Sequence, residues 1–170
     1  DAAGGDPVTL DILDGVQPSW SPGGHRIAYW GNYGGQRDIW TIPARAGATE
    51  ADALRVTEDA YIDYSPVWSP VSNRLAFISE RDGNPELYVM DADKSNVKRL
   101  TETDAAEYDI SWSPNGQTIL FVSERDGNPE IYVTAKDGTR QERLTSNTAV
   151  DDQPVWSPSG KRIAFVSYLD

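Results

Sequence analysis

The chain has 170 residues, a net charge of −12 and no cysteine, so it contains neither disulfides nor thiolate metal sites. Its acidic charge argues against nucleic acid and anionic lipid as partners, because both would be repelled, but it allows basic proteins and divalent cations. No apolar run reaches the roughly 20 residues that a membrane helix needs, so we expect no membrane insertion.

Residues 1–15 open the chain with small residues, and no signal peptide is recognisable in them. We predict that this segment is a flexible N-terminal arm. Within it, Pro7-Val8-Thr9-Leu10 precedes the next element at a distance that recurs later in the chain. That recurrence makes the segment a candidate outer strand.

The tripeptide Trp-Ser-Pro then occurs four times, beginning at Trp20, Trp68, Trp112 and Trp156, in steps of 48, 44 and 44 residues. A period in the low forties, with about four strands per unit, is typical of β-propeller blades. We predict an all-β propeller of four-stranded antiparallel blades, three complete and a fourth partial. The repeat region is 16–170, with blades at about 16–57, 63–101, 107–145 and 151–170.

Each unit contains four short apolar runs, which we name strands a to d. In the second unit they are 66–68, 74–78, 86–90 and 97–101. Strand b is apolar at successive positions, which predicts a sheet covered on both faces. Pro-x-Gly sequences predict tight a–b turns. Val71-Ser72-Asn73 departs from that pattern and predicts a modified turn, and 44–54 is the one plausible helical turn, with Thr49 as N-cap.

The second and third units share the unbroken sequence Ser-Glu-Arg-Asp-Gly-Asn-Pro-Glu, at 79–86 and 123–130. With Trp-Ser-Pro and the closing Arg-Leu-Thr, the pattern resembles the WD40-like repeat of the TolB β-propeller family across nearly the whole chain. The resemblance implies a propeller that is usually extracytoplasmic (periplasmic) in bacteria, binds other proteins and has no catalytic activity of its own. Similar blades also cover the active sites of prolyl-oligopeptidase-type peptidases.

The fourth unit provides only strands a and b. Pro7–Leu10 aligns with the strand d position and is a candidate for completing that blade, although its strand c would still be missing. Three explanations remain open: two chains associate and form a larger ring, the chain is a piece of a longer polypeptide, or a small four-bladed ring closes. Because open blade faces and raw strand edges favour association, we expect a homo-oligomer.

No catalytic constellation is recognisable. His25 is a lone turn histidine, and neither a Gly-x-Ser-x-Gly elbow nor a His-Glu-x-x-His motif occurs. We therefore predict a protein that is not an enzyme and has no cofactor, with a divalent cation such as calcium as the one candidate ligand at an acidic channel mouth.

Charged residues recur in the d–a and b–c loops, which share one face of a propeller. The predicted partner-binding residues are Asp14, Asp63, Glu107, Asp109, Asp151 and Asp152 in or beside the d–a loops, and Tyr33, Arg81, Asp82, Arg125 and Asp126 in the b–c hairpins. They would form a docking site for a protein or a basic peptide. The structural alternative is that Asp and Asn simply stabilise turns. For Trp30, packing between blades is the favoured interpretation.

Three functions are compatible with these patterns. The first is a non-catalytic interaction module that completes its ring by self-association. The second is an accessory propeller domain of a prolyl-oligopeptidase-type hydrolase. The third is a truncated or designed propeller whose main property is assembly.

Overall fold

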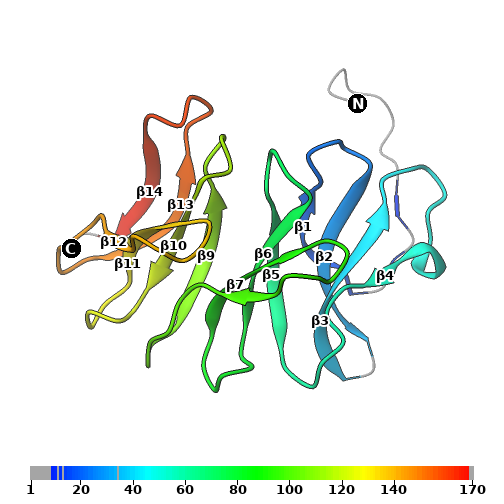
Figure 1. Cartoon of the computed structure of the whole chain (residues 1–170), viewed down its shortest axis with the longest axis horizontal. Coiled ribbons are helices and arrows are strands. Elements are labelled where there is room, and N and C mark those ends of the chain that lie inside the picture. The colour runs from blue at the N-terminus through cyan, green and yellow to red at the C-terminus, as the bar shows by residue number, and fades with distance from the viewer. Residues whose placement is uncertain (1–8, 11, 13, 34, 169–170) are drawn as a thin grey trace.

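Four antiparallel sheets stand side by side in chain order in the computed structural model, which describes residues 9–10, 12, 14–33 and 35–168 (Figure 1). The first sheet contains β1 (Val16–Trp20), β2 (Arg26–Tyr33), β3 (Gln36–Pro43) and β4 (Leu54–Arg55). The second contains β5 (Asp63–Trp68), β6 (Arg74–Ser79), β7 (Glu86–Asp91) and β8 (Lys98–Arg99).

The third sheet repeats this order with β9 (Glu107–Trp112), β10 (Thr118–Ser123), β11 (Glu130–Ala135) and β12 (Glu142–Arg143). The fourth consists of β13 (Val150–Trp156) and β14 (Ile163–Tyr168) in the described part of the chain. The predicted all-β blades are confirmed. Strand a is longer than expected and strand d is only two residues long.

The core lies between neighbouring blades rather than within one sheet. Leu75 and Phe77 of β6 face the first blade, whereas Ala76 and Ile78 face the third, and all four side chains are fully buried. The third blade in turn packs Leu120 and its neighbours against the fourth. A strand that is apolar at every position is therefore the expected sequence for a sheet that is covered on both faces.

The repeat tryptophans fix each blade to the one before it. Trp68 and Trp112 are 4% and 7% exposed, and the indole Nε1 of Trp112 donates a hydrogen bond of 3.1 Å to the Val67 carbonyl of the preceding blade. Trp20 occupies the same position in the first blade and is 62% exposed, since no blade precedes it among the described residues. The repeat tryptophan is therefore buried only where a preceding blade packs against it.

The outward face of the first blade is covered by the chain itself. Tyr29 and Ile42 on this face form a cluster with Leu10, Ile12 and Ala48. Ala48 belongs to the segment that the sequence marked as a helical turn, and η1 (Glu50–Asp52), a short 3₁₀ helix with Thr49 as N-cap, confirms that turn. The longer tail of the first blade therefore contributes part of the cover over this face.

The described part of the N-terminal arm does not form a strand. Thr9 and Leu10 are irregular, and Val8 lies outside the described residues. A blade-closing role for this segment stays a prediction.

The a–b turns follow the Pro-x-Gly pattern in three blades. Gly24, Gly116 and Gly160 have φ of +67°, +63° and +67°, and the N–H of each donates to the serine carbonyl three residues earlier. Positive φ favours glycine, which explains its recurrence. The second blade instead bonds the Ser72 hydroxyl to that of Ser69, so the predicted modified turn is confirmed.

The repeat tryptophans provide a matched test of this packing. We expect Trp112→Ala to lower the free energy of unfolding by about 3–5 kcal/mol, because it empties a buried site. Trp20→Ala should cost less than about 1 kcal/mol, because the ring already faces solvent. Urea unfolding monitored by circular dichroism measures both, and equal losses would contradict the proposed role of the preceding blade.

Candidate functional site

The first or second residue of the inner strand is a buried carboxylate in three blades. Asp63, Glu107 and Asp151 begin or nearly begin β5, β9 and β13, and each is 0% exposed. Burying a charge is costly unless it is paired and hydrogen-bonded. The prediction that these three acids are exposed and available to a partner is therefore wrong. Each buried negative charge must instead be balanced by groups within the chain.

Arg125 compensates Glu107. Its Nη2 lies 2.9 Å from Glu107 Oε2, its Nε donates to the Ser123 hydroxyl at 2.8 Å, and Ser123 donates to Glu107 Oε1 at 2.9 Å. The guanidinium also lies 5.5 Å from the ring centroid of Phe121 and 4.6 Å from that of Tyr132. Burial nevertheless raises the pKa of Glu107, against the opposing effect of Arg125.

The second blade repeats this arrangement with Asp63, Ser79 and Arg81. Arg81 Nη2 lies 3.3 Å from Asp63 Oδ1, and the guanidinium stacks on Tyr88 at 4.7 Å. Burial raises the pKa of Asp63 as well. The two predicted partner-binding arginines, Arg81 and Arg125, are therefore engaged inside their own blades.

A second buried carboxylate begins strand c of the second and third blades, and its counterpart in the first blade lies two residues inside β3. Glu86 is fully buried, and its Oε1 accepts from Arg99 Nη2 at 2.8 Å and from the Thr103 backbone N–H at 2.7 Å. Asp38 and Glu130 are held in the same way by Arg55 at 2.6 Å and Arg143 at 2.7 Å. Each junction between blades thus contains two carboxylates, one from each blade.

The b–c hairpin acids also have partners within the chain. Asp82 accepts a hydrogen bond from the Tyr88 hydroxyl and lies 3.3 Å from Arg99 Nη1. Asp126 makes the equivalent contacts with Tyr132 and Arg143. These interactions favour the turn-stabilising alternative for both acids.

The neighbouring Asn84 ties the hairpin to the next loop by donating to the Ala105 carbonyl at 2.6 Å. Nearly every polar residue of the shared eight-residue motif therefore holds a blade together. A role of these residues in binding a partner stays a prediction.

The first blade replaces the acid, serine and arginine with Gly15, Gly31 and Tyr33. The Tyr33 ring lies 4.7 Å from that of Trp40, and it fills the space above Gly31, where an added Cβ would meet the ring at 2.6 Å. Tyr33 thus packs within its blade rather than projecting from the hairpin tip. Trp30, beside it in β2, donates from Nε1 to the side chain of Gln17 at 2.7 Å.

The feature most distinctive of a binding site is a ring of left-handed residues on the inner strands. Each inner strand is interrupted by a bulge, and one non-glycine residue there has positive φ: Gln17 (+50°), Ser65 (+52°), Asp109 (+50°) and Gln153 (+53°). Such conformations are uncommon for non-glycine residues and cluster at functional sites. Their equivalent positions in four blades show that the bulge belongs to the repeat.

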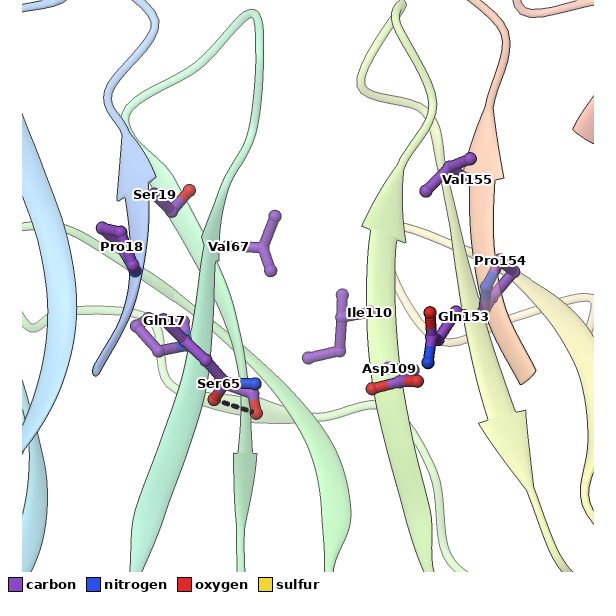
Figure 2. Close-up of a pocket in the computed structure, with 11 residues that line it drawn as sticks. Gln17, Pro18, Ser19, Ser65, Val67, Asp109, Ile110, Gln153, Pro154 and Val155 are labelled. Atoms are coloured by element: carbon purple, nitrogen blue, oxygen red, sulfur yellow. Dashed lines mark hydrogen bonds between the residues drawn. The ribbon is translucent and has the colours of Figure 1, made fainter. Parts of the chain in front are cut away.

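These four residues line a cavity of about 410 Å³ between the inner strands, together with Pro18, Ser19, Pro66, Val67, Ile110, Pro154 and Val155 (Figure 2). The Ser65 hydroxyl donates to Gln17 Oε1 at 2.9 Å, so these two side chains bridge the first and second blades. Figure 2 places Asp109 and Gln153 together on the opposite side, with Val67 and Ile110 between the two pairs. The cavity therefore has polar edges and an apolar centre.

Asp109 is the one acid among these four residues, and it lies close to Asp152 of the next blade. Burial and this second carboxyl raise the pKa of Asp109 to about 6. Asp152 occupies the position of Tyr64 and Tyr108 in the preceding blades. Asp109 lines the cavity, so its carboxyl and the neighbouring carboxyl of Asp152 form an electronegative site there that favours a cation.

Of the predicted acids, Asp109 and Asp152 come together, whereas Asp14 is exposed in the segment before β1. Within the described residues, no group of three or more metal-ligating side chains is arranged around one point. A divalent cation at the channel mouth stays a prediction.

The bulge ring was missed by sequence reasoning. A signal was nevertheless present, because Gln17, Ser65, Asp109 and Gln153 lie one repeat apart and proline follows three of the four. Repeated polar residues beside proline in an otherwise apolar inner strand indicate a bulge.

Comparison with known proteins agrees with the propeller fold. The family described as the TolB beta propeller domain matches residues 15–169. A protein TolB homolog of Chlorobium luteolum is 33% identical over 76 residues, which are 45% of this chain and 16% of the homolog.

A solved structure of a putative TolB from Agrobacterium tumefaciens superposes with a TM-score of 0.82 at 29% identity, covering 94% of this chain and 57% of that one. A puromycin hydrolase superposes with a TM-score of 0.72 at 14% identity, covering 24% of the enzyme, and this likeness shows the fold alone. The chain thus spans just over half of the putative TolB structure and about a sixth of the TolB homolog.

The Asp109 carboxyl should make stability depend on pH. Its pKa of about 6 in the folded chain lies above the ordinary value of 3.8, so the folded state binds the proton more tightly and stability falls as pH rises from about 4 to about 6. We expect Asp109→Asn to raise the free energy of unfolding at pH 8 by about 1 kcal/mol, a figure discounted because the group is only partly buried.

At pH 3.5 the same substitution should have little effect, because the Asp109 carboxyl is then neutral in the folded chain. Asparagine tolerates the left-handed backbone as aspartate does. Asp104→Asn, which neutralises an exposed acid, controls for net charge, and an equal gain in that variant at pH 8 would contradict the role of the carboxyl pair.

Proposed function

Because the chain belongs to the TolB β-propeller family, we propose that it is a non-catalytic module that binds other proteins at the channel mouth. The observation that carries this proposal is the ring of left-handed residues around the cavity of about 410 Å³. Four blades hold strained backbone at the same place, and that place is lined by polar groups facing an open cavity. A partner segment that fills the cavity would contact both its polar edges and its apolar centre.

Charge selects the kind of partner. The net charge is −12, and Asp109, which lines the cavity, has the carboxyl of Asp152 close to it. A lysine or arginine side chain placed between them would offset the repulsion between the two carboxylates. We therefore propose a basic peptide or a basic protein segment as the ligand class. The family also supports an extracytoplasmic location.

A second candidate is an accessory domain of a hydrolase. The fold likeness to puromycin hydrolase, of which the chain covers 24%, supports it. The two candidates differ in what faces the cavity: an accessory domain would hold it against a catalytic domain of the same polypeptide, whereas an interaction module would leave it accessible to a separate partner.

We also propose that the chain self-associates through its fourth blade. Val155, Val166 and Tyr168 are 54%, 38% and 57% exposed there. In the second blade, the equivalent Val67 and Ile78 pack against the next blade. The first blade is different, because Leu10, Ile12 and Ala48 cover its outward face. The asymmetry favours two copies meeting through the same face of the fourth blade, as in a twofold dimer.

Binding of a basic peptide tests the first proposal. A fluorescent decalysine peptide should bind the chain, and Asp109→Asn combined with Asp152→Asn should weaken binding at least tenfold, because both carboxylates of this pair are removed. The matched control is Asp93→Asn with Asp137→Asn, which makes the same change of charge in the c–d loops on the opposite face. Equal weakening in both pairs, measured by fluorescence anisotropy, would show that only net charge matters.

Sedimentation velocity at micromolar concentration tests the proposed self-association. We expect a dimer that Val166→Lys converts to a monomer, since the lysine places a charge in the apolar contact. Trp20→Ala should leave the dimer intact. Dissociation by Trp20→Ala would instead indicate a head-to-tail contact, and a monomeric unmodified chain would refute self-association.

A further inference from the structure

We propose that the cavity between the inner strands takes a partner segment that carries an acidic residue as well as a basic one. The acidic residue would bind Arg37, which is stacked on Trp30 beside the cavity, and the basic residue would bind the carboxyl pair of Asp109 and Asp152. This inference rests on the proposed function and deepens it, because it adds a second anchor and fixes the charge pattern of the partner.

Arg37 and Trp30 are specific to the first blade. The second and third blades have proline at the position of Arg37, and isoleucine or valine at the position of Trp30. In the pairing of β2 with β3, Trp30 lies opposite Ile39 and Arg37 lies opposite Asn32, close to the b–c hairpin. Both residues therefore belong to the face of the propeller that carries the channel mouth.

Arg37 lies over the Trp30 ring, and its side chain is exposed. The guanidinium carbon is 5.0 Å from the ring centroid. Trp30 Nε1 donates to Gln17 Oε1 at 2.7 Å, and the Ser65 hydroxyl donates to the same oxygen at 2.9 Å. Because Gln17 and Ser65 line the cavity, this chain of contacts holds the stacked arginine next to the cavity edge.

The guanidinium of Arg37 has no carboxylate partner among the described residues. Five other arginines each lie within 3.3 Å of a fully buried carboxylate, namely Arg55, Arg81, Arg99, Arg125 and Arg143. Arg37 is thus not part of the ion pairs that hold the blades together. Stacking on a ring leaves the edge of a guanidinium available, and that edge matches a carboxylate in a two-point contact.

The stacked pair stands where the first blade meets the second. Ala28 and Ile39, which are two residues away from Trp30 and Arg37 on the same strands, pack against the second blade. Residues two apart on a strand share a face. Burial raises the pKa of Tyr64 in the second blade and Arg37 lowers it, which also places the guanidinium near that blade.

The two sides of the cavity consequently differ in charge. Gln17, with the guanidinium of Arg37 beyond it, lies on one side, and Asp109, with the carboxyl of Asp152 close to it, lies on the other (Figure 2). The side chain of Val67 lies between the two sides. A segment with opposite charges at its two ends would cross this apolar centre in one direction only, because the reverse direction places like charges together.

The test compares two series of fluorescent peptides with blocked ends. In both, two lysines are joined by a Gly-Ser spacer of varied length to a last residue, which is glutamate in one series and glutamine in the other. If net charge alone governed binding, glutamate would weaken it, because the chain carries a charge of −12. We expect the opposite at the matching spacer length, with the glutamate peptide bound about threefold more tightly, as measured by fluorescence anisotropy.

Three variants assign this preference to Arg37. Arg37→Gln should abolish the preference for glutamate, and Arg37→Lys should keep only about half of it, since lysine retains the charge without the planar edge. Arg162→Gln makes the same change of charge at an exposed residue in the a–b turn of the fourth blade, on the opposite face, and should leave the preference intact.

Two results would overturn the inference. One is equal or weaker binding of the glutamate peptides at every spacer length, and the other is a preference that survives in Arg37→Gln. In both cases the glutamine peptides would still bind through Asp109 and Asp152, so the proposed function would stand without this second anchor. Failure of both series to bind would instead contradict the proposed function and the inference together.

Discussion

The structure depends on how buried carboxylates are compensated where two blades meet. A charge inside a protein is tolerated only with an opposite charge and hydrogen bonds, and removing one partner is costly because the other remains buried. Glu107 begins an inner strand, and its partner Arg125 lies in the loop that joins strands b and c of the same blade. The ion pair therefore forms only when strands a and b are in register. This dependence makes the network a device for specifying the register of each blade.

The same network explains why the eight-residue motif is unbroken in two blades. Its serine and arginine hold the inner-strand acid, its aspartate holds a tyrosine and an arginine, its asparagine fixes the next loop and its final glutamate anchors that loop. A change at one position would leave a buried group unsatisfied. The first blade shows the alternative: the acid, serine and arginine are replaced together, by Gly15, Gly31 and Tyr33, so that no buried carboxylate remains at the start of its inner strand.

Much of the fold could be predicted from the sequence, because the blade pattern is repeated and each strand has a recognisable pattern of apolar residues. The apolar run of strand b and the Pro-x-Gly turns identified the sheets. The site was harder to predict. The repeat spacing places Asp63 and Glu107 near the channel mouth. It does not reveal whether each side chain points outward to solvent or inward to the arginine of the b–c loop in the same blade. The bulge decides this, since it directs the third residue of the inner strand to the cavity and leaves the first buried.

The first and fourth blades differ in whether their outward apolar face is covered. The first blade has exchanged its ion pair for aromatic packing and acquired a cap from the arm and the 44–54 segment. The fourth blade has kept the acid, the serine and the phenylalanine of the ion-pair network, and its face is exposed. The exposed apolar face of the fourth blade is the surface through which we propose self-association, whereas the corresponding outward face of the first blade is covered.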